Sequence, residues 1–455
     1  MRRFLLLCTA LVLAGCATAP QTEVAARLST APDALPPMKT FAGSGAVVTQ
    51  RSNADIARDF LDLSFQLESG RALPVLSRFE GEVTVRVTGM VPPSLGPDLD
   101  KLLDRLRREA GISVRRVGAN ERASITIEAL ARDEMRRLVP HAACFVVPRV
   151  TSWDEFRRER RSASVDWTTL DRREELAIFL PGDVAPQEIR DCLHEELAQA
   201  LGPLNDLYRL PDSVFNDDNF HTVLTGFDML VLRTYYAPEL VSGMSREQVA
   251  QRLPAILARL NPGGERRASR PTAATPRSWI EAIETALGPR TAQSRRVEAA
   301  RRAVGIAREQ NWADTRMAFS LFALGRLSLA TEADVALASF LQARQIYGLR
   351  PETQLHAAHV AMQLAAFALS SNQPDAAVEL VEASLAPVQQ AENAALLATL
   401  LMIKAEALAL QGQTQRARQV RLDSLGWARY GFGSDAEVRA RADEIAALSP
   451  LRPRS

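Results

Sequence analysis

Residues 191–206 read Asp-Cys-Leu-His-Glu-Glu-Leu-Ala-Gln-Ala-Leu-Gly-Pro-Leu-Asn-Asp, and this stretch decides how the chain around it is interpreted. Pro186 lies just upstream, where its fixed φ suits the first turn of a helix. Gly202-Pro203 then ends any helix that passes through the stretch. We therefore predict one helix over residues 186–201, and we expect it to be the central element of the first domain.

The predicted helix has two chemically different faces. At about 100° per residue, Glu195, Glu196 and Gln199 share one arc, and leucine and alanine side chains occupy the opposite arc. A helix of this kind buries its apolar face. We therefore expect the leucines to pack inward and the polar stripe to line a cleft.

The segments before this helix alternate between helical and strand patterns. Apolar residues recur at helical spacing in two segments, and period-two alternation or short apolar runs predict five strands. The helices are expected at 54–67 and 97–110, and the strands at 79–88, 112–117, 124–129, 143–150 and 175–180. The sequence therefore predicts an α+β or mixed α/β domain over about residues 51–260.

The pair His194-Glu195 suggests a zinc-binding helix, but its spacing does not fit the usual motif. Such helices place a second histidine four residues after the first, and Ala198 occupies that position. We therefore interpret His194 as a helix-surface or supporting residue rather than a zinc ligand.

A register one residue later resembles the metzincin metallopeptidases. Their pattern places two metal ligands and a glutamate base on one helix, followed by a glycine and a third ligand. Glu196 falls at the position of the base and Gly202 at that of the glycine. The three ligand positions carry Glu195, Gln199 and Asn205, so the resemblance implies a zincin-like fold in which each metal ligand has been replaced.

A wider set of residues carries a second likeness, which covers about residues 50–250. These residues are Cys192, Glu195, Glu196, Gln199, Gly202, Asn205, Asp206, Phe215, Asn216, Asp217, Gly243 and Met244. In these positions the chain is similar to the bacterial domain of unknown function 2927 family. Phe215 also stands where the metzincins have the methionine of a characteristic turn. Together these resemblances imply a zincin-like fold without an established reaction.

The replaced ligand positions determine which chemistry we expect. Amide oxygens are poor substitutes for the imidazoles that catalytic zinc prefers, so we expect no zinc and no other cofactor. The same positions could hold a harder cation such as Ca²⁺, but weakly. We therefore predict a non-catalytic binding domain. The alternatives are a hydrolase that uses Glu196 with an atypical metal site, supported by His194 or His221, and a helix whose polar residues are purely structural.

The first residues have the pattern of a bacterial lipoprotein signal. A short apolar run follows two arginines and ends in Leu13-Ala14-Gly15-Cys16, which resembles a lipobox. The resemblance implies that residues 1–15 are a signal peptide and that Cys16 carries lipid; the alternative is an ordinary secretory signal. Ala17 favours the outer membrane over the inner membrane. Residues 16–50 are rich in proline, and we expect them to form a flexible tether on the periplasmic side.

Export also determines how the four cysteines are interpreted. Cys8 would leave with the signal peptide, and Cys16 would carry the lipid. Cys144 and Cys192 then remain, and two thiols in an oxidising compartment are a natural pair. We therefore predict a Cys144–Cys192 disulfide, with two buried free thiols as the alternative.

The chain beyond residue 260 separates into a linker and a helical region. Residues 261–276 are rich in turn-forming residues and lack apolar periodicity, so we predict a linker there. Residues 277–450 are rich in alanine, and three blocks recur at intervals of 40 and 41 residues. The recurring positions are Ala336, Phe340 and Ala343, then Ala376, Leu380 and Ala383, then Ala417, Arg421 and Ser424.

These blocks resemble tetratricopeptide repeats, although the usual period is about 34 residues. The resemblance implies stacked helix pairs whose surface binds proteins or peptides. The alternative is a helical bundle without regular stacking. His356 and His359 lie three residues apart on one of these helices, near Glu352. We expect them to be exposed surface residues rather than a metal site.

Composition limits the partners that we expect. The chain of 455 residues has 55 basic and 54 acidic residues, so its net charge gives no reason to bind nucleic acid. Envelope proteins or peptides are the expected partners of the repeats, and the membrane is the expected partner of the lipid anchor. The sequence thus predicts a lipid-anchored envelope protein that acts in recruitment or scaffolding. The alternative is a periplasmic hydrolase similar to a metallopeptidase.

Overall fold

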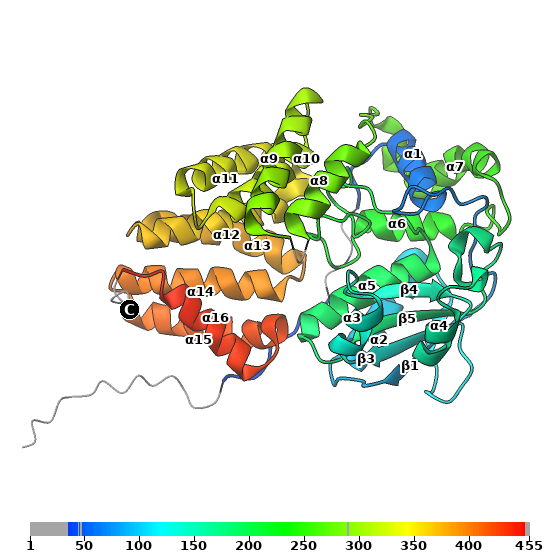
Figure 1. The fold of residues 1–455 in the computed structure, drawn as a ribbon, viewed down its shortest axis with the longest axis horizontal. Coiled ribbons are helices and arrows are strands. Elements are labelled where there is room, and N and C mark those ends of the chain that lie inside the picture. Colours follow the sequence, from blue (N-terminus) through cyan, green and yellow to red (C-terminus); the bar gives the residue numbers. More distant parts are fainter. Residues whose placement is uncertain (1–34, 44, 46–47, 289–290, 451–455) are drawn as a thin grey trace, which may run out of the picture. The chain divides into compact units, whose positions relative to one another are not determined.

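The computed structural model describes residues 35–43, 45, 48–288 and 291–450. The first part of this described chain is a mixed α/β region (Figure 1). Its strands are β1 Val83–Gly89, β2 Val114–Arg116, β3 Ile125–Leu130, β4 Phe145–Pro148 and β5 Leu176–Pro181. Its helices are α1 Asn53–Ser64, α2 Leu95–Arg105, α3 Arg132–Leu138, α4 Trp153–Glu159, α5 Pro186–Leu201, α6 Gly226–Tyr235 and α7 Arg246–Leu260. A π-helical turn, Leu106–Ala110, extends α2.

The second part of the described chain is helical throughout, so the predicted order of an α/β region followed by an all-α region is confirmed. Its helices are α8 Arg277–Leu287, α9 Gln293–Glu309, α10 Thr315–Ser328, α11 Ala333–Tyr347, α12 Gln354–Ser370, α13 Pro374–Gln390, α14 Ala394–Leu410, α15 Thr414–Phe432 and α16 Asp435–Ala446.

The strands form one sheet in the order β2-β1-β3-β5-β4. The first four in this order run parallel, and β4 pairs antiparallel with β5 at the edge. Every residue of β5 is buried, which is the pattern of a central parallel strand covered on both faces. All five predicted strands are observed, although β1 begins at Val83 rather than at residue 79.

One face of the sheet is covered by α2 and α5. The leucines of α5, including Leu193 and Leu197, are fully buried in the same core as Ile127 of β3 and Ile178 of β5. Burying a leucine side chain contributes about 1.5–3 kcal/mol relative to leaving it exposed. The prediction that the leucine face of α5 packs inward is therefore confirmed, and α5 has the predicted bounds.

The other face of the sheet is covered by α3 and α4, which the sequence patterns did not predict. Trp153 and Phe156 of α4 pack against Phe179 of β5, with ring centroids 5.2 and 5.5 Å apart. Each of these helices has seven residues, which is too short for a clear helical period.

The predicted disulfide between Cys144 and Cys192 is confirmed, with the two Cα atoms 5.9 Å apart. Cys144 directly precedes the edge strand β4, and Cys192 lies in the middle of α5. The bond therefore ties the edge of the sheet to the central helix.

A buried arginine holds the end of α5. The Arg173 guanidinium donates hydrogen bonds to the backbone carbonyls of Gln199 (2.6 Å), Ala200 (2.8 Å) and Gly202. Carbonyls in the last turn of a helix have no partner within the helix, and a positive charge there also suits the helix dipole. Arg173 thus fixes the turn from which the next loop departs.

The second part consists of packed helix pairs, α10 with α11, α12 with α13 and α14 with α15, and they lie side by side in Figure 1. A further pair, α8 with α9, precedes the blocks that the sequence identified. Gly325 of α10 allows close packing, because a Cβ atom there would lie 2.6 Å from the Phe340 ring of α11.

The packing positions of the middle block differ from the prediction by one residue. Ala377, Val381 and Ser384 are buried there, and the predicted Ala383 is exposed. The physical reason is the start of the helix: the repeated positions are the fourth, eighth and eleventh residues of each second helix, and α13 begins at Pro374. The intervals are therefore 41 and then 40 residues.

Two segments between and before these regions have specific partners. Residues 36–41, within the expected tether, lie on α15, where Phe41 stacks on Trp427 with ring centroids 4.6 Å apart. Within the expected linker, the Arg270 amide donates to Asp55 at 2.9 Å.

The predicted signal peptide, with Cys8 and Cys16, lies outside the described residues. In the part of the chain that is described, none of the helices has the length and apolar character needed to cross a membrane.

Candidate functional site

The polar residues of α5 lie in a cluster of carboxylates. Glu196 is only 4% exposed, and carboxylate oxygens of Glu195 and Glu196 lie within 4.8 Å of each other. Cys144 Sγ lies within the same distance of both, but it is bonded to Cys192 and is not a thiolate.

The expectation that this stripe lines an open cleft is wrong, because Glu196 and Gln199 are both buried. The loop after α5 returns over this face of the helix. It brings Asp206 Oδ2 to 3.5 Å from the Gln199 amide nitrogen. The polar residues therefore face one another inside the protein.

Further acidic residues extend the cluster toward the surface. The Asp206 carboxyl is in hydrogen-bonding contact with Glu68, a residue of the exposed loop after α1. Asp217 is exposed as a residue, but its carboxyl contacts the buried Tyr208 hydroxyl. We call Glu195, Glu196, Asp206, Asp217 and Glu68 the carboxylate cluster.

Burial and mutual repulsion keep protons on this cluster. Burial is the largest cause in each case, and neighbouring carboxylates add to it. The pKa of Glu195 is raised to about 8 and that of Asp217 to about 7, and those of Glu196 and Asp206 lie well above their usual values. The charges that shift the pKa values of Glu195 and Glu196 all belong to other carboxylates.

The three replaced ligand positions do not converge on one point as a zinc site requires. Glu195 belongs to the carboxylate cluster, and Gln199 directs its amide nitrogen at Asp206. Asn205 donates from its amide nitrogen to the Asp62 backbone carbonyl at 2.9 Å. These carboxylate and amide groups do not fit catalytic zinc, which takes imidazoles and one carboxylate.

His194 lies on the other side of α5 and is buried, so its interpretation as a helix-surface residue is wrong. Its Nδ1 accepts a hydrogen bond from the Leu224 amide at 3.2 Å. Burial, together with Arg190 and Arg105, lowers the pKa of His194 well below its usual value, so the ring is neutral at pH 7. A neutral ring that accepts at Nδ1 carries its proton on Nε2. His194 therefore supports the loop before α6 and does not take part in the carboxylate cluster.

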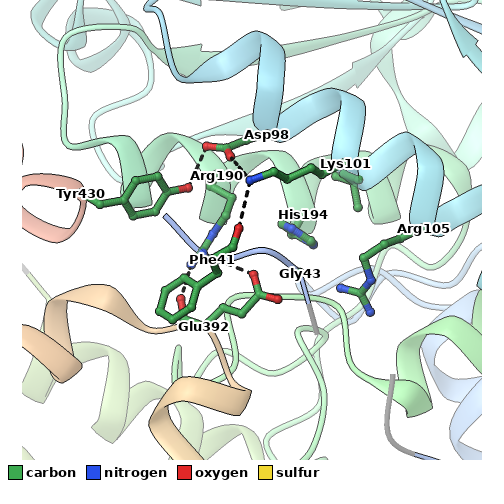
Figure 2. Close-up of a pocket in the computed structure, with 10 residues that line it drawn as sticks. Phe41, Gly43, Asp98, Lys101, Arg105, Arg190, His194, Glu392 and Tyr430 are labelled. Carbon is green, nitrogen blue, oxygen red and sulfur yellow. Dashed lines mark hydrogen bonds and ion pairs between the residues drawn. The ribbon is translucent and has the colours of Figure 1, made fainter. Parts of the chain in front are cut away.

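A small mixed-charge pocket of about 20 Å³ lies next to His194, where α2 and α5 meet the repeats (Figure 2). Tyr430 of α15 donates to Asp98 at 2.7 Å, and Lys101 donates to the Phe41 carbonyl at 3.0 Å. Arg190 donates to the Glu392 carbonyl at 2.8 Å. The space holds about one water molecule, so we assign the pocket to the packing of the two regions rather than to a ligand.

The histidines of α12 are buried at a second contact between the two regions, so the prediction that they are exposed is wrong for His356, which has no exposed surface. Its Nε2 lies 3.1 Å from Asp218 Oδ2. Phe220 packs on both rings, with centroids 4.4 Å from His356 and 4.7 Å from His359. The loop after α5 therefore covers this helix face. Burial also lowers the pKa of His359 to about 3 and that of His221 to about 4.

The segment that resembles the metzincin turn is fixed by a buried carboxylate. Asp228 at the start of α6 accepts hydrogen bonds from the Ser213 hydroxyl (2.5 Å) and the Val214 amide (3.2 Å). It also accepts from the amide of Thr225, whose side chain caps the same helix. Phe215 is fully buried behind this turn.

A larger cleft of about 600 Å³ lies at the carboxyl ends of β1, β3 and β5. Ligands of open α/β sheets commonly bind at this edge. The cleft is lined by both parts of the chain, including Arg132 and Glu188 from the α/β region and Arg429 and Glu437 from α15 and α16. Its lining carries both signs of charge.

The comparison with known families agrees with the sequence resemblance. Residues 53–255 match the model of a family described as a protein of unknown function, DUF2927. This match covers the α/β region, including the carboxylate cluster except for the residues beyond its end, and it leaves the helical repeats unmatched. No curated protein matches the chain.

Proposed function

We propose that this chain is a lipid-anchored envelope protein whose zincin-like domain is non-catalytic and whose tetratricopeptide-like helices recruit or scaffold envelope proteins or peptides. The observation that carries the first half of this proposal is the set of donor groups on and after α5. Glu195, Gln199 and Asn205 stand where a zincin holds its metal, and the Asn205 amide is bound to the chain itself. Such a set does not activate a zinc-bound water at neutral pH.

The binding role rests on the packed helix pairs and on the cleft between the two regions. Stacked helix pairs offer a continuous surface, which is the general basis of partner binding by repeat proteins. The cleft of about 600 Å³ is within the size range of ligand sites, and its mixed charges suit a peptide better than a nucleic acid. We therefore favour an envelope peptide or protein segment as the partner.

A peptide-cleavage assay tests the non-catalytic half of the proposal. The wild-type chain, incubated with a mixed peptide library and added zinc, is expected to give no more cleavage than Glu196→Gln, since Glu196 is the only matching position for a catalytic base. Glu128→Gln is the matched control, because Glu128 is a partly buried carboxyl on the opposite face of the sheet. Cleavage that Glu196→Gln abolishes and Glu128→Gln retains would support the alternative, a metallopeptidase-like hydrolase.

Membrane fractionation tests the anchor. The Cys16→Ser chain is expected to move from the membrane fraction to the soluble periplasmic fraction, because lipid on this thiol is the proposed attachment. Detergent should be needed to extract the wild-type chain and not the variant. A variant that stays on the membrane would contradict the lipid anchor.

A further inference from the structure

The carboxylate cluster has more negative groups than the described protein neutralises. Ionising several carboxylates at one buried place is unfavourable unless a positive charge compensates them. The groups that shift the pKa values of Glu195 and Glu196 are carboxylates alone, and those that act on Asp206 all raise its pKa. The cluster must therefore carry protons or a bound cation.

Two oxygen atoms favour the cation. Glu196 Oε2 is buried and finds no hydrogen-bond partner among the described residues, and Asp206 Oδ1 is in the same position. A buried acceptor without a donor costs about 1–3 kcal/mol, and more for a charged group. Glu196 is less than 5% exposed and its carboxylate lies against that of Glu195, so its free oxygen belongs to the interior of the cluster.

We propose that Glu195, Glu196 and Asp206 bind a hard divalent cation of the Ca²⁺ or Mg²⁺ class, close to the contact between the α/β region and the repeats. All three residues offer carboxylate oxygens, which are the ligands that these ions prefer. The side-chain carbonyl of Gln199 is an additional oxygen beside Asp206. The ligands differ from the zincin-type set, since Glu196 and Asp206 take the place of Asn205.

The site is next to the repeats. Tyr208 contacts the Asp217 carboxyl at the edge of the cluster and packs edge-on against Trp279 of α8, with ring centroids 5.1 Å apart. Glu284 of α8 also adds to the negative potential at Asp217. A cation bound in the cluster would therefore reduce repulsion across this contact and stabilise the packing of α8 on the loop after α5.

Terbium luminescence and thermal unfolding of the full chain test the proposal. After removal of metal with EDTA and dialysis, Tb³⁺ should give saturable emission on excitation of tyrosine and tryptophan, because Tyr208 and Trp279 lie beside the site. Ca²⁺ or Mg²⁺ should displace it. At about 100 times its Kd, the displacing ion should raise the Tm by about 5 °C.

The variant Glu196→Gln separates binding from folding. It should weaken cation binding by at least about tenfold. It should also raise the Tm of the metal-free chain, because it removes one repelling carboxyl without changing its volume. Glu128→Gln should leave both the luminescence and the cation-dependent Tm shift at the wild-type level.

The pH dependence gives a second readout. The ligand carboxyls must lose protons to bind the ion, and the pKa of Glu195 is raised to about 8 in the metal-free fold. Apparent affinity should therefore rise between pH 6 and pH 8. In the metal-free chain the same raised pKa means that the folded state binds more protons, so the contribution of Glu195 to stability falls as pH rises from about 4.5 to about 8.

Three results would overturn the proposal. The first is no saturable Tb³⁺ emission together with no Tm response to Ca²⁺ or Mg²⁺. The second is an equal response in wild type and Glu196→Gln. The third is binding of Zn²⁺ with no response to either hard cation.

Discussion

Replacing Arg173 by methionine is expected to lower the free energy of unfolding by about 3–5 kcal/mol. The Arg173 side chain is fully buried, and its guanidinium satisfies three carbonyls at the end of α5. Methionine occupies a similar volume but donates no hydrogen bond, so these carbonyls would lose their partner where water has little access. Urea unfolding followed by circular dichroism measures the change.

The neighbouring Arg172 provides a matched control, because it is exposed. Arg172→Met is expected to change the free energy of unfolding by less than about 0.5 kcal/mol. If both variants lose the same stability, the carbonyls at the end of α5 do not depend on Arg173. The turn at Gly202 and the loop that carries Asp206 would then be fixed in some other way.

Removing the disulfide with a Cys144→Ala, Cys192→Ala double variant is expected to cost about 4 kcal/mol. The two cysteines are 48 residues apart, and a cross-link over a segment of this length reduces the entropy of the unfolded chain considerably. The bond also ties β4 to α5, so its loss should loosen the sheet edge beside Glu195. The measurement is again the free energy of unfolding in urea.

Reduction of the wild-type chain offers an independent check of this effect. Dithiothreitol should lower the Tm of the wild type toward that of the double variant, and it should leave the Tm of the double variant unchanged. A wild type whose Tm does not respond to complete reduction would refute a stabilising role for the Cys144–Cys192 bond.

The sequence was sufficient where one local signal decided the outcome. Pro186 and Gly202 gave both ends of α5, and the alternating or apolar runs located all five strands. The disulfide followed from counting the cysteines that remain in an exported chain. Each of these conclusions needed only the chemistry of neighbouring residues.

Sequence reasoning failed where burial depended on distant segments. His356 lies on a helix whose pattern suggested an exposed face, but Phe220 and Asp218, more than 130 residues away in sequence, cover it. The packing positions of α13 were misplaced by one residue, because alanine is frequent enough in this helix to match two registers.

The candidate site was predicted only in part. The register of Glu195, Glu196, Gln199 and Asn205 was identified from spacing, but the spacing could not show that the loop after α5 folds back over them. Asp206 and Asp217 were recognised as family-like positions and not as members of a charge cluster. Arg173 was missed, because a lone arginine before a strand carries no local signal of its carbonyl partners.

The metal content of the purified chain tests most directly whether the zincin-type centre has been replaced. The full chain, purified without added metal or chelator, should contain no stoichiometric zinc by elemental analysis, since amides and carboxylates fill the former ligand positions. Glu196→Gln should contain no less zinc than the wild type. One equivalent of zinc that survives dialysis in the wild type and is lost in Glu196→Gln would contradict the account.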